Sequence, residues 1–270
     1  MPKAPRVPTP PLPGPLREPP PRPGEQNGGG GIVGGAKEAG INVVDWVDER
    51  TALSGGARWV MFRKVPKGTN WFYTLGSATM FAFLSQAVTG VFLAMYYRPD
   101  PAGGAYESIR YVTNDVFLGQ FVRGMHKWGS SVMVVLVFLH MARTFFFGAY
   151  KYPRELNWVI GVVLLILTLV MSFTGYLLPF DQRAYWATEV GVNINGTGPL
   201  IGPYLSDFLR GGSEFNATTL SRFYAIHMLL IPGLLFALIG AHLYLVTKLG
   251  TTAPPWEKPD QRAELQEAEA

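Results

Sequence analysis

The sequence predicts an all-α protein whose main part is a membrane-embedded four-helix bundle. The first observation is composition: 48% of the 270 residues are hydrophobic and only 16% are charged, against about 25% charged residues in soluble domains. The second is a set of four long apolar stretches, each near the roughly 20 residues that a helix needs to cross a bilayer. The third is that all four histidines lie inside two of these stretches at almost equal spacing.

Two segments of different composition precede the first apolar stretch. Residues 1–40 are rich in proline and then in glycine, so they bury too little apolar surface to offset the entropy of ordering, and we expect a disordered tail. Residues 41–58 interleave apolar and charged side chains at helical spacing. This pattern predicts an amphipathic helix at the membrane interface, anchored by Trp46.

The four-helix domain is predicted to cover residues 71–249, followed by a polar tail over residues 250–270. Aromatic residues at both ends of the first span fit the interfacial belt of a membrane helix. Pro179 ends the third span, and Pro232 is expected to bend the fourth. The segments that precede the second and fourth spans are interpreted as loops. The predicted spans cover about 71–97, 117–147, 158–178 and 220–248.

The distribution of basic residues predicts the orientation of the chain. Four spans place both termini on one side, and the termini and the connection between the second and third spans carry more lysines and arginines than the other side, which holds Arg183, Arg210 and Arg222. The positive-inside rule makes this side cytoplasmic, so we expect an integral protein of a bacterial cell membrane with both termini in the cytoplasm. The net charge of +4 is dispersed, and we expect no nucleic-acid partner.

The histidines form two pairs with nearly the same separation. His126 and His140 are fourteen residues apart in the second span, and His227 and His242 are fifteen apart in the fourth. At 100° per residue, each pair returns to within about 40° or 60° of one helix face, with roughly 21 Å between its members. Two such helices packed side by side would offer one imidazole each at two levels, which is the arrangement for bis-histidine ligation of two stacked haems.

A lone histidine inside a membrane helix is more often a hydrogen-bonded core or pore residue than a ligand. The matched spacing favours ligation, because packing alone does not require equal depths. A haem-free transporter or assembly protein that uses the histidines as a proton relay remains an alternative, which a pigment spectrum would exclude.

Glycines repeat the same spacing in the other two spans. Glycines in membrane helices usually permit close helix packing. The shared separation of fourteen residues favours a second interpretation here, in which a missing side chain at each level gives room to the edges of two haems. The four glycines are Gly76 and Gly90 in the first span and Gly161 and Gly175 in the third.

Arginines and the absence of cysteine limit how a haem could be held. Arg123 and Arg143 lie three residues beyond His126 and His140, each towards a membrane surface, where a guanidinium either pairs with a haem propionate or extends into the interface. The chain has no cysteine, which excludes a disulfide, a thiolate cluster and covalent haem attachment. We therefore expect two non-covalent b-type haems.

Six motifs in the chain resemble those of a known family. They are Asn70-Trp-Phe-Tyr-Thr-Leu-Gly76, Tyr96-Tyr-Arg-Pro99, Arg123-Gly-Met-His-Lys-Trp128, Pro153-Arg-Glu-Leu156, Thr174-Gly-Tyr-Leu-Leu-Pro-Phe-Asp-Gln182 and Thr219-Leu-Ser-Arg-Phe-Tyr-Ala-Ile-His227. Together they are similar to the N-terminal, four-helix half of cytochrome b, and specifically to its split form, cytochrome b6. The resemblance covers residues 41–250, and the fifteen-residue histidine spacing in the fourth span is the value typical of cytochrome b6.

The resemblance implies a subunit of a cytochrome bc (b6f-like) complex in a respiratory or photosynthetic chain. Such a complex is a translocating quinol–cytochrome c (or plastocyanin-like acceptor) oxidoreductase, and this chain would not be active alone. Quinol would be oxidised at the outer side, with one electron crossing through two haems to reduce quinone at the inner side, coupled to proton translocation. His126 and His227 would ligate the low-potential haem, and His140 and His242 the high-potential haem.

The resemblance also implies partners and quinone sites. The partners are a separate C-terminal cytochrome b half of the subunit IV type, a Rieske iron–sulfur protein and a c-type cytochrome, in a complex expected to be a dimer. The candidates for the quinol oxidation pocket are Tyr185, Ala187 and Thr188. Lys248 is a candidate for the inner quinone site or a haem propionate.

One departure from the family and one alternative function qualify this prediction. Chloroplast-type cytochrome b6 has a cysteine where this chain has Thr74, and that cysteine tethers an additional c-type haem, so covalent attachment is excluded here. The alternative is a di-haem membrane anchor that passes electrons from a dehydrogenase or hydrogenase to quinone. The paired glycines and the Thr174-Gly-Tyr motif favour the first function.

Overall fold

The computed structural model describes residues 43, 45–48, 50, 68–212 and 214–256. The chain divides into two units, residues 1–63 and residues 64–270, which are considered separately. In the first unit the described residues are helical, and the guanidinium of Arg50 donates to the carbonyl of Trp46 and lies 4.2 Å from the centre of its ring. The predicted tail 1–40 and most of the predicted surface helix lie outside the described residues.

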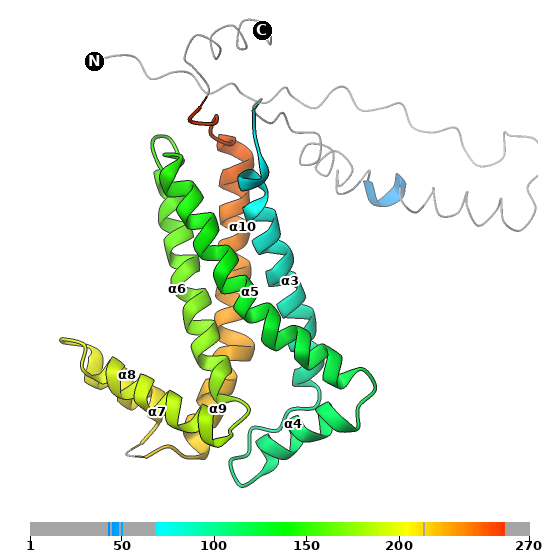
Figure 1. Cartoon of the computed structure of the whole chain (residues 1–270), viewed down its shortest axis with the longest axis vertical. Coiled ribbons are helices and arrows are strands. Elements are labelled where there is room, and N and C mark those ends of the chain that lie inside the picture. Colours follow the sequence, from blue (N-terminus) through cyan, green and yellow to red (C-terminus); the bar gives the residue numbers. More distant parts are fainter. Residues whose placement is uncertain (1–42, 44, 49, 51–67, 213, 257–270) are drawn as a thin grey trace, which may run out of the picture. The chain divides into compact units, whose positions relative to one another are not determined.

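The described part of the second unit is helical and contains no strand (Figure 1). Four continuous helical stretches are long and apolar enough to cross a membrane: 71–94, 119–146, 155–177 and 217–249. The predicted all-α class with four spans is therefore confirmed. The elements are η1 (Trp71–Thr74), α3 (Leu75–Ala94), α4 (Gly104–Asn114), α5 (Gly119–Phe146), α6 (Glu155–Leu177), α7 (Gln182–Gly196), α8 (Gly202–Arg210), α9 (Ala217–Ala225), η2 (Ile226–Leu230) and α10 (Ile231–Leu249).

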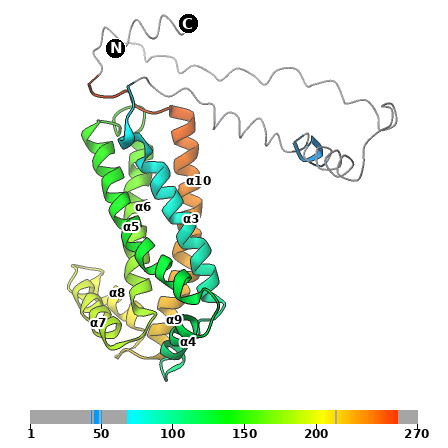
Figure 2. The ribbon, with the colours of Figure 1, turned by 45° about the vertical axis from the view of Figure 1, so that its right-hand side comes forward.

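The four spanning helices lie side by side, and the short helices gather at one end of the bundle (Figures 1 and 2). A buried cluster in the middle of the bundle joins α3, α5 and α10 through Ala82, Phe83, Met133, Val137, Ile231 and Leu235. A second cluster lies where α4, α7, α8 and α9 meet the end of α6, through Ala105, Leu177, Val192, Leu209, Leu220 and Phe223. Large apolar side chains elsewhere on the spans are exposed, as expected of helices whose solvent is lipid.

Two predicted loops are wrong, because both contain helices. The segment before the second span includes α4, and the segment before the fourth span forms α7 and α8. Asp181 starts α7 by accepting a hydrogen bond from the backbone N–H of Ala184 at 2.8 Å, and Gly211 ends α8 in a left-handed conformation. Glycine, proline and asparagine are frequent from Gly191 to Gly212, and Trp186 and Tyr204 remain exposed, so the composition of this segment resembles that of a loop.

The fourth span contains a wide turn rather than a simple bend at Pro232. Over η2 the backbone is π-helical, and the N–H of Ile231 bonds to the carbonyl of Ile226, five residues back. A π-turn takes in one residue more than the corresponding α-helical turn. It also lies next to the position where Pro232 has no N–H to donate, so the irregularity and the proline coincide.

Candidate functional site

Two pairs of histidine rings face each other across the bundle. The ring centroids of His126 on α5 and His227 on η2 are 6.4 Å apart, with 77° between the ring planes; we refer to this pair as level 1. The centroids of His140 on α5 and His242 on α10 are also 6.4 Å apart, with 81° between the planes; this pair is level 2. The structure thus brings together the histidines that the spacing placed at equal depth.

The wide turn explains how two different spacings reach the same two levels. α5 is an uninterrupted α-helix, so fourteen residues separate its histidines by close to four full turns. In the fourth span the histidines are fifteen positions apart, and His227 lies in the π-turn. Because that turn accommodates one additional residue, the remaining rotation matches that of α5. The two helices therefore point both pairs of histidines towards each other.

Each histidine ring packs against a glycine of α3 or α6. A side chain at these positions would meet the imidazole itself, so the glycines first of all make room for the ring. The distances from an added Cβ to the histidine Cε1 atom are 3.2 Å for Gly76 and His140, 3.2 Å for Gly90 and His126, 3.7 Å for Gly161 and His242, and 2.5 Å for Gly175 and His227. Clearance for haem edges stays a prediction.

Threonines contact the level 1 histidines, and the sequence reasoning missed them. The hydroxyl of Thr89 lies 2.9 Å from Nδ1 of His126, and the hydroxyl of Thr174 lies 3.2 Å from Nδ1 of His227. The signal that could have identified them is a threonine immediately before the level 1 glycine of both α3 and α6. The backbone carbonyl of Met171 is a further acceptor for Nδ1 of His227, at 3.0 Å.

A cavity of about 450 Å³ surrounds the level 2 histidines and extends to the nearby end of the bundle. This volume lies within the range of about 300–1,000 Å³ that is usual for ligand and cofactor sites. Buried polar atoms on its wall have no hydrogen-bond partner among the described residues: Nε and Nη2 of Arg143, Oδ1 of Asn157 and Oγ1 of Thr252. Buried donors without a partner are costly, so this part of an otherwise mostly apolar cavity suits a polar group.

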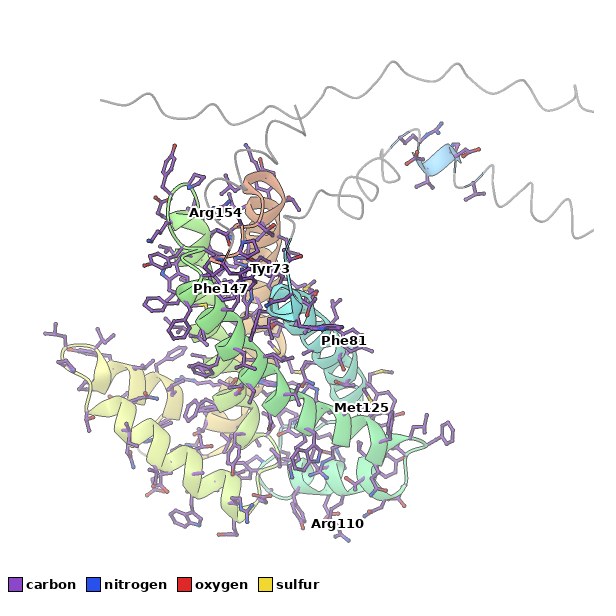
Figure 3. The ribbon with its side chains drawn as sticks, turned by 45° about the horizontal axis from the view of Figure 1, so that its top comes forward. Tyr73, Phe81, Arg110, Met125, Phe147 and Arg154 are labelled. Atoms are coloured by element: carbon purple, nitrogen blue, oxygen red, sulfur yellow. The ribbon has the colours of Figure 1, made fainter. Side chains whose placement is uncertain are left out.

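Two arginines give this cavity a positive end. The guanidinium of Arg143 lies 3.9 Å from the centre of the Tyr73 ring, and Arg154 donates to the carbonyls of Leu249 and Gly250. Figure 3 shows Tyr73, Phe147 and Arg154 at the same end of the bundle. Burial, followed by repulsion from Arg143, lowers the pKa of Arg154. An anionic group bound here would offset this repulsion.

Other predicted residues lie apart from the cavity. Arg123 on α5 donates to the hydroxyl of Thr113 on α4 at 3.3 Å. Lys248 is exposed, and its Nζ atom lies 3.2 Å from the hydroxyl of Tyr244 rather than on the cavity wall. The exposed Thr74 hydroxyl donates to the carbonyl of Trp71, at the first turn of the first span.

Of the three candidates for the quinol pocket, Tyr185 and Thr188 lie one turn apart on the inward side of α7 and Ala187 lies on its exposed side. The ring of Tyr185 packs against the rings of Phe180 and Phe215, with centroids 5.9 and 5.5 Å away. Thr188 is buried, and its hydroxyl has no hydrogen-bond partner within the described part of the chain. Ala187 is exposed. The three residues were predicted together because they are close in the sequence, but their side chains have different surroundings.

The arrangement would fit a metal held in a group that supplies its remaining ligands. Metal–imidazole bonds are about 2 Å long, so two bonds to one central ion take up roughly 4 Å of the 6.4 Å between ring centroids, and the two half-rings account for the rest. Only two histidines meet at each level, and in the described residues no cluster of three or more His, Cys, Asp or Glu could hold a bare ion. A porphyrin supplies the missing nitrogens.

These features define a class of protein, a four-helix membrane protein that binds haem. The family model described as cytochrome b/b6/petB matches residues 60–250, and the chain belongs to the cytochrome b/b6 family. The family predicted from the motifs is confirmed.

Relatives of similar length support this assignment. The chain is 44% identical over 220 residues to the menaquinol:cytochrome c reductase cytochrome b subunit of Bacillus subtilis, covering 78% of this chain and 98% of that subunit. It is 43% identical over 213 residues to cytochrome b6 of Heliobacterium modesticaldum, covering 78% of this chain and 100% of that protein.

A solved structure described as a hyperthermophilic respiratory Complex III has the same fold as this chain. The TM-score is 0.71 at 31% identity, and the match covers 80% of this chain. The chain spans 59% of the length of the chain in that structure. The protein is thus a cytochrome b-type component of electron transport.

The glycines at the two levels differ in how much room they leave, which yields a test. In Gly175→Ala the new methyl carbon must displace His227, because 2.5 Å is far below a carbon–carbon contact, and we expect the level 1 haem to be lost. Gly161→Ala is the matched control, since its methyl would meet His242 at an ordinary 3.7 Å. Haem content per purified chain measures both, and equal losses would contradict the geometry.

The wide turn predicts that one deletion is tolerated where another is not. Removing the exposed Leu229 shortens the histidine spacing of the fourth span to that of α5, and a regular helix should then keep both pairs facing. Removing the exposed Val132 from α5 rotates His126 away from His140 by about 100°, with no wide turn to absorb it. Reduced-minus-oxidised spectra should show two haems in the first variant and a deficit in the second; the reverse result would refute this explanation.

Proposed function

We propose that this chain is the di-haem, cytochrome b6-type subunit that carries electrons across the membrane between two quinone sites of a bc-type complex. The observation that carries the proposal is the pair of facing histidines at each of two levels of one bundle, both at 6.4 Å. His126 and His227 hold the low-potential haem, and His140 and His242 hold the high-potential haem. When bound, the two b-type haems supply one-electron carriers whose alignment connects the two faces of the membrane.

The residues at level 2 are suited to an anionic or quinone-like group. Arg143 has two buried nitrogens without hydrogen-bond partners among the described residues. Arg154 lies close enough to repel Arg143, so both positive charges would attract an anion bound between them. Both line the cavity that holds His140 and His242. We assign Arg143 to a haem propionate or to quinone at the inner site, and Lys248, which is exposed, to a peripheral role there. Thr74 provides no thiol for a covalently attached haem.

The orientation that we propose rests on the sequence that flanks the spans. Lysines and arginines of the segments before the first span and after the fourth join Lys151 and Arg154 on the level 2 side, which favours placing this end and both termini in the cytoplasm, although Arg183, Arg210 and Arg222 reduce the difference between the two sides. Level 1 then lies near the outer face, close to α7. Quinol oxidation would occur there beside Tyr185, Ala187 and Thr188, and Arg123 would pair with a propionate of the level 1 haem.

The outer site requires partner subunits. A separate C-terminal cytochrome b half completes the quinol pocket, a Rieske protein takes one electron, and a c-type cytochrome receives it, in a dimeric complex. The other electron passes to the inner side, with protons released outside and taken up inside. Relatives named as menaquinol:cytochrome c reductase subunits make menaquinol the first substrate to test.

The first experiment measures pigment and histidine dependence together. We expect pyridine haemochrome analysis of the purified complex to give two b haems per chain, with the level 1 haem lost in both His126→Ala and His227→Ala and the level 2 haem lost in both His140→Ala and His242→Ala. Lys127→Ala, which changes an exposed side chain beside His126, is the control. Each loss should reduce menaquinol-dependent cytochrome c reduction at least tenfold.

Two outcomes would count against this function. A chain without b haem, or with haem that is insensitive to the histidine substitutions, would refute the ligand assignment. Two haems in a complex that transfers electrons only between a dehydrogenase or hydrogenase partner and quinone, without reducing cytochrome c, would instead favour the membrane-anchor alternative.

A further inference from the structure

The level 1 histidines differ from the level 2 histidines in the hydroxyl groups that contact them. Thr89 and Thr174 are the residues before Gly90 and Gly175, and both threonines are almost completely buried, with exposed fractions of 6% and 1%. At level 2 the corresponding positions before the glycines are the apolar Leu75 and Ile160. The two levels therefore share helix geometry but not hydrogen bonding.

The direction of the Thr89 hydrogen bond can be deduced from its other contacts. A threonine hydroxyl has one proton to donate, and Thr89 directs it to the carbonyl of Ser85 at 2.6 Å. The Gln86 carbonyl, 3.2 Å away, is a second acceptor for that proton, so the hydroxyl is best placed to accept from Nδ1 of His126, which corresponds to the tautomer with the proton on Nδ1. With Nδ1 protonated, the lone pair of the neutral ring is on Nε2, which is the nitrogen free to ligate.

Thr174 repeats this arrangement on the facing helix. Its hydroxyl donates to the carbonyl of Val170 at 2.9 Å and therefore accepts from Nδ1 of His227. The Met171 carbonyl accepts from the same Nδ1. Both level 1 rings thus have the same tautomer. His227 has two acceptors for Nδ1, the Thr174 hydroxyl and the Met171 carbonyl. His126 has the Thr89 hydroxyl, and the Gln86 carbonyl lies nearby.

At level 2 this support is weaker. Nδ1 of His242 is buried and makes no hydrogen bond with the described residues, although the carbonyl of Asn157 lies near it. No hydroxyl precedes Gly161, because Ile160 occupies that position. A hydrogen bond accepted from Nδ1–H makes an imidazole more basic and a better donor to the metal, which stabilises the ferric over the ferrous state.

We propose that Thr89 and Thr174 are positioning residues that hold His126 and His227 in the ligating tautomer and lower the reduction potential of the level 1 haem relative to the level 2 haem. This inference rests on the proposed bis-histidine sites. It assigns to two hydroxyl groups a difference between the haems that the helix geometry alone does not produce, since the histidine separations at the two levels are equal.

The test is a redox titration of the whole complex with optical and EPR detection. In Thr89→Val, which keeps the shape but removes the acceptor, the ferric-to-ferrous equilibrium at level 1 should shift towards ferrous by about three- to tenfold, where tenfold equals about 59 mV for one electron. The EPR signal of the level 1 haem should shift with it. Level 2 should be unchanged. Thr174→Val should have a smaller effect, because the Met171 carbonyl still lies 3.0 Å from Nδ1 of His227, within hydrogen-bond distance, whereas the Gln86 carbonyl is only near His126.

Conservative and reciprocal variants separate this role from a packing role. Thr89→Ser retains the hydroxyl and should keep the wild-type potential. Ile160→Thr adds a hydroxyl before Gly161 and should lower the level 2 potential while level 1 stays constant. If Thr89→Val loses the level 1 haem entirely and Thr89→Ser retains it, the hydroxyl is required for positioning and the inference is supported.

Failure of the inference and failure of the proposed function give different results. If the wild-type complex holds two haems and both valine variants retain wild-type potentials and EPR signals, the threonines do not tune the site and the inference is overturned. The same holds if Thr89→Ser shifts as far as Thr89→Val. If the wild-type chain binds no haem, the proposed function itself fails, and with it the premise of this role.

Discussion

The structure depends on one constraint, that two pairs of imidazole rings from separate helices face each other at two levels. Meeting it once requires only a suitable helix crossing. Meeting it twice requires that the rotation between the histidines of α5 equal the rotation between those of the fourth span. The π-turn at η2 provides this equality for spans whose spacings differ by one residue. The glycines of α3 and α6 then let the outer surfaces of the rings pack directly against neighbouring backbone.

The levels could be predicted because helical periodicity converts sequence spacing directly into direction and depth. His126 and His140 needed no knowledge of neighbouring helices, and the same was true of Gly76 and Gly90. The hydrogen bond between Thr89 and His126 was beyond this reasoning, because it depends on which faces of α3 and α5 meet. The π-turn could not be predicted for a similar reason. The sequence gives the number of residues between two histidines but not how many of them each helical turn contains.

The short helices mark the other limit of sequence reasoning. Glycine, proline and asparagine are frequent over α7 and α8, so the composition resembled that of a loop, although residues of both helices are buried against the end of the bundle. The same segment carries Tyr185 and Thr188, whose surroundings differ although they are three residues apart. Exposed aromatic residues on α7 and α8, such as Trp186 and Tyr204, agree with a site that other subunits complete.

The wide turn in the fourth span also sets the rotational phase between two parts of that helix. Residues before it, including α9, follow one phase, and residues of α10 follow another. His227 lies within the turn and His242 follows it, so closing the turn to an α-helical one without removing a residue would rotate one histidine against the other by about 100°. The number of residues between these two histidines and the width of the turn are therefore tied to each other, and neither can change alone without loss of one facing pair.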